Sequence, residues 1–141
     1  MNYLLDTNII SELISKKPNQ KVIDFINSLD ENNVFLSVIT IGEIKSGIQN
    51  VQDQNKKEKL SYWLNNDLLQ RFDNRIINID TNIMLSWGEI NQQLKTIGKP
   101  LPIMDSIIGA TCISLDFTLV TRNEKDFQNL DIKIINPFDF N

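Results

Sequence analysis

The sequence contains no histidine and only one cysteine, Cys112. The absence of histidine excludes Ser–His and Cys–His nucleophile pairs, an imidazole general base and imidazole ligands to zinc. Cys112 lies in the apolar stretch 107–115, so we expect a small buried thiol and not a nucleophile. Carboxylates are therefore the main side chains left for polar chemistry.

Long apolar runs and a basic leader segment are also missing. No stretch approaches the roughly 20 apolar residues that a membrane-spanning helix needs, and the N-terminus does not have the pattern of an export signal. A lone cysteine is typical of a reducing compartment. We therefore expect a cytoplasmic chain that does not contact a membrane.

Basic residues are fewer than acidic residues in this sequence. The chain has 14 Lys and Arg against 18 Asp and Glu, which gives a formal net charge of −4. This sign argues against a broad basic surface for nucleic acid, so any polyanion must be held locally. The 141 residues, 41% of them hydrophobic, predict one globular domain, residues 1–141, that buries its own core.

Short β-branched runs alternate with helical apolar stripes along the chain. Strands are expected at 2–5, 34–39, 75–79, 117–121 and 132–135. Helices are expected at 9–14, 22–29, 40–51, 60–72, 83–97 and 103–115, with a helical hairpin in the middle of the chain. This alternation predicts an α/β fold with α/β/α layers around a central, mainly parallel sheet.

Polar residues cluster where these strands are expected to end. Asp6 follows the first strand, Glu43 lies on the first turn of the helix after the second, and Asp105 opens the helix before the fourth. Asn123 and Asp126 follow the fourth strand. Ligands of open parallel sheets bind beyond the carboxyl ends of the strands, so these groups are expected at one rim of the sheet.

Carboxylates gathered in a confined site need a compensating cation, because like charges raise each other's pKa. Oxygen ligands without histidine or thiolate favour Mg²⁺ or Mn²⁺. Such an ion could support hydrolysis of a phosphodiester. Helix capping is the alternative for each acid taken alone: Asp6 could cap a helix, Thr40-x-x-Glu43 matches a capping box, and Asp105 suits a helix N-terminus. Spacing alone leaves both interpretations open.

Ordered motifs along the chain resemble those of PIN-domain proteins, particularly toxin ribonucleases of the VapC and FitB type. The matching segments are 4–12 (LLDTNIISE), 36–44 (LSVITIGEI), 105–111 (DSIIGAT), 120–123 (VTRN) with 126–127 (DF), and 135–138 (INPF). The resemblance implies a PIN fold in which Asp6, Glu43 and Asp105 surround Mg²⁺ or Mn²⁺. It further implies endonucleolytic cleavage of RNA.

The fourth acidic position departs from the family pattern. Relatives can carry Asp after the Thr-Arg pair, where this sequence has Asn123, a neutral group that brings no charge to a metal. Asp126 could act in its place as a fourth catalytic acid, or could belong to the separate Asp-Phe turn. Asn8, Thr121 and Asn123 are further candidates, as groups that orient Asp6 or a metal-bound water.

The resemblance also implies partners. The chain would be the toxin of a type II toxin–antitoxin pair, would bind a cognate antitoxin across its active-site groove, and would form a homodimer and a toxin–antitoxin hetero-oligomer. Alternatives are a catalytically silent interaction module of the same fold and a DNA-directed PIN-like nuclease. A phospho-acceptor domain is disfavoured because no pair of adjacent acids follows the first strand.

Overall fold

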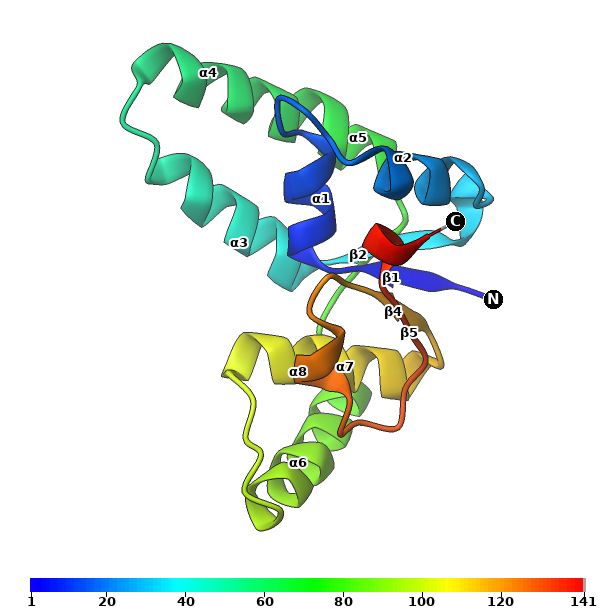
Figure 1. The fold of residues 1–141 in the computed structure, drawn as a ribbon. Coiled ribbons are helices and arrows are strands. Elements are labelled where there is room, and N and C mark those ends of the chain that lie inside the picture. Colours follow the sequence, from blue (N-terminus) through cyan, green and yellow to red (C-terminus); the bar gives the residue numbers. More distant parts are fainter. Residues whose placement is uncertain (141) are drawn as a thin grey trace.

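The computed structural model describes residues 1–140, which form a five-stranded, fully parallel sheet covered by helices (Figure 1). The strand order is β3-β2-β1-β4-β5, so the first strand lies at the centre. The strands are β1 (Tyr3–Leu5), β2 (Val34–Ser37), β3 (Ile76–Ile77), β4 (Thr118–Val120) and β5 (Ile134–Ile135).

Helices lie on both faces of the sheet. One face carries α1 (Thr7–Leu13), α2 (Gln20–Asn27), α3 (Val38–Gln49), α4 (Gln54–Trp63) and α5 (Leu69–Arg71), and the other carries α6 (Thr81–Thr96), α7 (Ile103–Leu115) and α8 (Glu124–Phe127) (Figure 1). Shorter turns are η1 (Glu31–Asn33) and η3 (Pro137–Asp139), and a π-helical segment, η2 (Leu64–Leu68), joins α4 to α5. The expected α/β/α architecture is confirmed.

Two hydrophobic cores form, one on each face of the sheet. Successive strand residues point to opposite faces, so Leu5 and Val120 enter the core beside α1 and α2, whereas Leu4 and Leu119 enter the core beside α6 and α7. All four side chains are at most 1% exposed. Burial on both faces explains why these short strands are mainly apolar and do not alternate between apolar and polar residues.

The second strand is shorter than the sequence predicts. It ends at Ser37, whose hydroxyl accepts a 3.0 Å hydrogen bond from the Ile39 N–H and caps α3. The predicted strand 34–39 is therefore too long, because this cap draws the β-branched Val38 and Ile39 into the helix against their propensity. Since α3 begins at Val38, Glu43 lies on its second turn, and the predictions of a first-turn position and of a Thr40-x-x-Glu43 capping box are wrong.

The expected hairpin is formed by α3 and the α4–η2–α5 segment, which project together from the sheet (Figure 1). Within this segment the side-chain amides of Asn65 and Asn66 donate to the carbonyls of Ser61 and Tyr62, at 3.0 and 3.2 Å. No helix within residues 1–140 has the length and apolar character needed to traverse a bilayer.

Candidate active site

Asp6 lies in the turn between β1 and α1 and has two structural roles. As the N-cap of α1, its Oδ1 accepts a 2.8 Å hydrogen bond from the Thr7 N–H. Its Oδ2 accepts hydrogen bonds from the Thr121 hydroxyl at 2.8 Å and from the Asn8 amide at 3.3 Å. The side chain is 5% exposed. The capping interpretation of Asp6 is thus correct, and the same carboxylate also reaches the end of β4.

Burial is the main influence on the Asp6 carboxylate. Loss of solvent raises its pKa, hydrogen bonds from Thr121, Thr7 and Asn8 lower it, and the charge of Glu43 raises it again. The net result is a pKa above the ordinary value for Asp. Asp6 is therefore a buried acid whose charge is only partly compensated by neutral donors.

Glu43 is held from the neighbouring helix. The Thr7 hydroxyl, at the start of α1, donates a 2.6 Å hydrogen bond to Glu43 Oε1 and lies 3.2 Å from the Thr40 hydroxyl. Glu43 is otherwise exposed. Sequence reasoning missed this role of Thr7, although its position directly after Asp6 and the hydroxyl of Thr40 one helical turn before Glu43 were available as signals.

Asp105 lies in the first turn of α7 and is half-buried. Burial, as the largest cause, and the like charges of Asp6, Glu43 and Asp126 together raise its pKa to about 6. Acids from α1, α3, α7 and α8 therefore act on one another across the carboxyl edge of the sheet. Asp126, on the exposed first turn of α8, is the fourth member of this cluster.

The loop after β4 is tied to Asp6 through its backbone. The Asn123 N–H donates to the Thr121 hydroxyl at 3.0 Å, and the Arg122 N–H donates to the Asn8 side-chain oxygen at 3.2 Å. The Asn123 side chain forms no cap bond with α8. Asn123 therefore contributes its backbone to this network, whereas Asp126 contributes charge.

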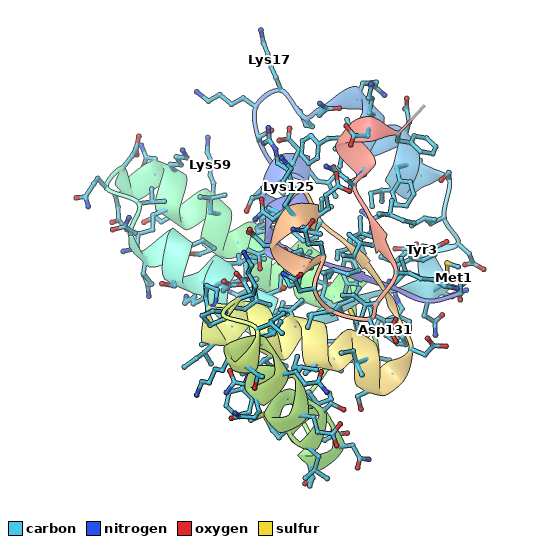
Figure 2. All side chains as sticks on the ribbon, turned by 60° about the horizontal axis from the view of Figure 1, so that its bottom comes forward. Met1, Tyr3, Lys17, Lys59, Lys125 and Asp131 are labelled. Atoms are coloured by element: carbon cyan, nitrogen blue, oxygen red, sulfur yellow. The ribbon has the colours of Figure 1, made fainter. Side chains whose placement is uncertain are left out.

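Basic groups do not neutralise the acidic cluster. The basic side chains labelled in Figure 2 come from separate segments, with Lys17 in the α1–α2 connection, Lys59 on α4 and Lys125 on α8. Within residues 1–140, the ion pairs are those of Glu31 with Arg71 and Arg75, away from the acids at the sheet edge. None of these ion pairs involves an acid of the cluster, and in the described part of the chain no basic group lowers the pKa of Asp6 or Asp105.

The donor chemistry of this cluster fits a hard divalent cation. Its side-chain donors are carboxylate, hydroxyl and amide oxygens, which suit Mg²⁺ or Mn²⁺. In the part of the chain that the structure describes, no three acids already stand together in a metal-ligating arrangement. Carboxylates with like charge keep apart unless a cation lies between them, so Asp6, Glu43 and Asp105 share a neighbourhood and not a closed ligand shell.

A parallel sheet with an acidic cluster beyond the carboxyl ends of its strands defines an α/β protein with an acidic site at that edge. The chain belongs to the PIN domain family, whose model matches residues 3–133. It is similar to Toxin FitB of Neisseria gonorrhoeae, with 33% identity over 135 residues that cover 96% of this chain and 97% of the relative.

Two further comparisons extend this result. The chain is 29% identical over 136 residues to the VapC ribonuclease Y4jK of Sinorhizobium fredii, which covers 96% of this chain and 97% of that protein. The crystal structure of FitAcB from Neisseria gonorrhoeae superimposes with a TM-score of 0.93 at 33% identity and covers 98% of this chain and 99% of the other. The family resemblance predicted from the ordered motifs is confirmed.

Proposed function

We propose that this chain is a Mg²⁺- or Mn²⁺-dependent endoribonuclease and the toxin of a type II toxin–antitoxin pair. The observation that carries this proposal is the convergence of charge from Asp6, Glu43 and Asp126 on the half-buried Asp105, without an ion pair to neutralise it. Similarity over nearly the whole chain to proteins named as a toxin and as a ribonuclease supports the same activity.

Asp6, Glu43 and Asp105 are the residues that would hold the cation. When bound, the cation would polarise a phosphodiester oxygen and favour ionisation of the attacking water. Thr121 and Asn8 orient the Asp6 carboxylate through their hydrogen bonds, and Thr7 orients Glu43. Groups that fix ligand carboxylates in this way set cation affinity as well as geometry.

Asp126 is the fourth catalytic acid in this proposal. It lies at an exposed position on α8, and its charge reaches Asp105. An exposed carboxylate beside a cation site can take a proton from the attacking water and release it to solvent. The Asn123 amide cannot accept that proton at neutral pH.

The proposed partners are an RNA substrate, a cognate antitoxin protein and a second copy of the chain. A toxic nuclease must be silenced in the cell that makes it, so an antitoxin that covers the acidic edge is expected, within a hetero-oligomer built on a toxin homodimer. Light scattering on the purified toxin, alone and with its antitoxin, measures both assemblies.

The test is cleavage of a structured RNA by protein purified free of antitoxin. We expect cleavage that needs Mg²⁺ or Mn²⁺, stops with EDTA, and falls at least about 100-fold in Asp6→Asn or Asp105→Asn. Asp116→Asn is the matched control, because Asp116 is an exposed acid at the opposite end of the same helix from Asp105.

Three other outcomes would contradict the proposed activity. Equal activity in wild type and Asp6→Asn would show a contaminating nuclease and refute the enzymatic proposal. A folded wild type that binds its antitoxin but cuts no RNA would indicate a silent interaction module. Preferential cleavage of a DNA oligonucleotide of the same sequence would indicate a DNA-directed nuclease.

A further inference from the structure

Asp105 differs from the other acids of the cluster in how it is held. Asp6 accepts three hydrogen bonds and Glu43 accepts one from Thr7. Within residues 1–140 no hydrogen bond contributes to the pKa of the Asp105 carboxyl group, which is shifted by burial and by like charges alone. The position of this carboxylate therefore depends on the backbone of the first turn of α7.

The first turn of α7 lacks the usual cap. Its N-cap residue is Pro102, which provides no side-chain hydrogen bond to the exposed N–H groups of the helix. The turn is instead fixed by Ser106, the residue next to Asp105, whose hydroxyl is buried and donates a 2.7 Å hydrogen bond to the Ile103 carbonyl. A feature outside α7 also contacts Ser106.

That feature is Trp87, which is half-buried on α6, the helix that packs against α7 on the same face of the sheet (Figure 1). Its indole Nε1–H donates a 2.8 Å hydrogen bond to the Ser106 hydroxyl oxygen. The single Ser106 hydroxyl proton is donated to the Ile103 carbonyl, so the hydroxyl oxygen can accept only from another donor, here the indole. These two bonds fix the orientation of the Ser106 hydroxyl. The result is a chain of hydrogen bonds from α6 through Ser106 to the turn that carries Asp105.

We propose that Trp87 is a positioning residue that acts through Ser106 to hold Asp105 in place for the cation. The inference rests on the proposed function, since it assigns Asp105 a role in cation binding. The hydrogen bond from the Trp87 indole to the Ser106 hydroxyl links α6 directly to the turn that carries Asp105. The sequence shows Trp87 only as one apolar position on a helical face, which does not reveal this contact.

Loss of the hydrogen bond between Trp87 and Ser106 should affect cation binding and not RNA binding. An Asp105 carboxylate that moves by a fraction of an ångström loses ligand geometry, whereas the rest of the protein surface, on which RNA binding would depend, is unchanged. Loss of the indole hydrogen bond should therefore weaken metal affinity and lower kcat at subsaturating metal, and leave KM for RNA unchanged.

Calorimetric titration with Mn²⁺ tests this inference on four variants: Trp87→Phe, Ser106→Ala, the double variant and Trp63→Phe. We expect a roughly tenfold loss of Mn²⁺ affinity in both single variants and no further loss in the double variant than in Ser106→Ala, because the indole acts through the Ser106 hydroxyl. Trp63→Phe is the matched control, since Trp63 packs against the core on the other face of the sheet. Its Mn²⁺ affinity should equal that of wild type.

The free energy of unfolding in EDTA separates positioning from simple stability. A Trp87→Phe protein that is less stable but binds Mn²⁺ within twofold of wild type would overturn the inference, as would additive losses in the double variant. Should Trp87→Phe fold poorly, Ser106→Ala gives the same test, because it removes the acceptor and keeps the large side chain.

A spectroscopic measurement supplies a readout independent of cleavage. In Trp63→Phe, Trp87 is the remaining tryptophan, and its indole N–H signal can be followed by nitrogen-15 NMR during titration with Mg²⁺. We expect the signal to shift in a saturable manner as Mg²⁺ is added, and an unmoved signal at saturating Mg²⁺ would refute the coupling. Asp105→Asn distinguishes the two proposals: if it binds Mn²⁺ normally the proposed site fails, whereas if it alone loses Mn²⁺ only the role of Trp87 fails.

Discussion

The Thr7 hydroxyl donates a 2.6 Å hydrogen bond to Glu43 Oε1 and so joins the first residue of α1 to the second turn of α3, 36 positions away in the sequence. The neighbouring residue, Asp6, is tied to Thr121 at the end of β4. Two adjacent residues thus form hydrogen bonds with an acid on α3 and with a hydroxyl directly after β4. The turn after β1 is the centre from which the acidic edge is organised.

Removing the Thr7 hydroxyl should affect catalysis more than stability. Thr7→Val keeps the shape of the side chain but leaves Glu43 without its donor, and we expect RNA cleavage to fall by roughly 10- to 100-fold. Thr7→Ser retains the hydroxyl and should stay within about threefold of wild type. Single-turnover cleavage at fixed Mn²⁺ measures both, and a fully active Thr7→Val would show that Glu43 needs no such support.

Thr121→Val should destabilise the fold. The Asp6 carboxylate is 5% exposed, and this substitution removes a 2.8 Å hydrogen bond to it while also depriving the Asn123 N–H of its acceptor. A buried polar group left unsatisfied costs about 1–3 kcal/mol, so the urea midpoint should fall. Thr121→Ser is the control and should recover most of the loss. An unchanged midpoint in Thr121→Val would contradict this reading of the network.

The pKa of Asp105 predicts how stability depends on pH. Its folded-state pKa is raised to about 6 from the ordinary value of 3.8, so the folded chain binds this proton more tightly than the unfolded chain. The favourable contribution is present at low pH and is lost as pH rises through about 6. In EDTA, Asp105→Asn should therefore melt a few degrees above wild type at about pH 7.5, with a smaller difference at about pH 5.

Thermal unfolding monitored by circular dichroism provides this measurement. Addition of Mn²⁺ at about pH 7.5 should raise the Tm of wild type and leave Asp105→Asn nearly unchanged, since a ligand stabilises only the state that binds it. A wild type that melts above Asp105→Asn at about pH 7.5 in EDTA would mean that the acids do not repel one another as the structure indicates.

Arg75 should be far more sensitive than Arg71 to replacement by Lys. The Arg75 guanidinium donates to the backbone carbonyls of Glu31 and Val34, both at 2.6 Å, and lies 4.7 Å from the centre of the Phe72 ring. Its side chain is 13% exposed, against 66% for Arg71. A lysine ammonium cannot form these hydrogen bonds and the ring contact together, as the planar guanidinium does. Arg75→Lys should therefore lose about 1–3 kcal/mol of unfolding free energy. The exposed Arg71→Lys should change it by less than about 0.5 kcal/mol.

Local signals explain which elements are predictable from sequence. The helix 103–115 is predicted with its observed bounds, since Pro102 precedes it and Asp116 ends it in the left-handed conformation, with φ at 55°. Gly98, with φ at 70°, likewise follows α6 where the sequence predicts its end. These boundaries are set by residues that lie next to them in the chain.

Boundaries and contacts set by tertiary structure are not predictable in the same way. Val38 and Ile39 favour a strand by composition, and only the Ser37 cap and the packing of α3 place them in a helix. The acids at the sheet edge follow from the rule for parallel strands, which needs only their order. The hydrogen bonds that hold these acids in place do not follow from that rule. The bonds from Thr7 to Glu43 and from Trp87 to Ser106 depend on how the helices pack against one another.

The hydrogen bond between Asp6 and Thr121 spans 115 positions, nearly the full length of the chain. On the ribosome, the N-terminal half emerges with its acids long before the segment that completes their surroundings has been translated. Truncated products of an interrupted message therefore lack Thr121 and the hydrogen bond that it donates to Asp6. Translation itself thus delays completion of the acidic cluster until the polypeptide is almost finished.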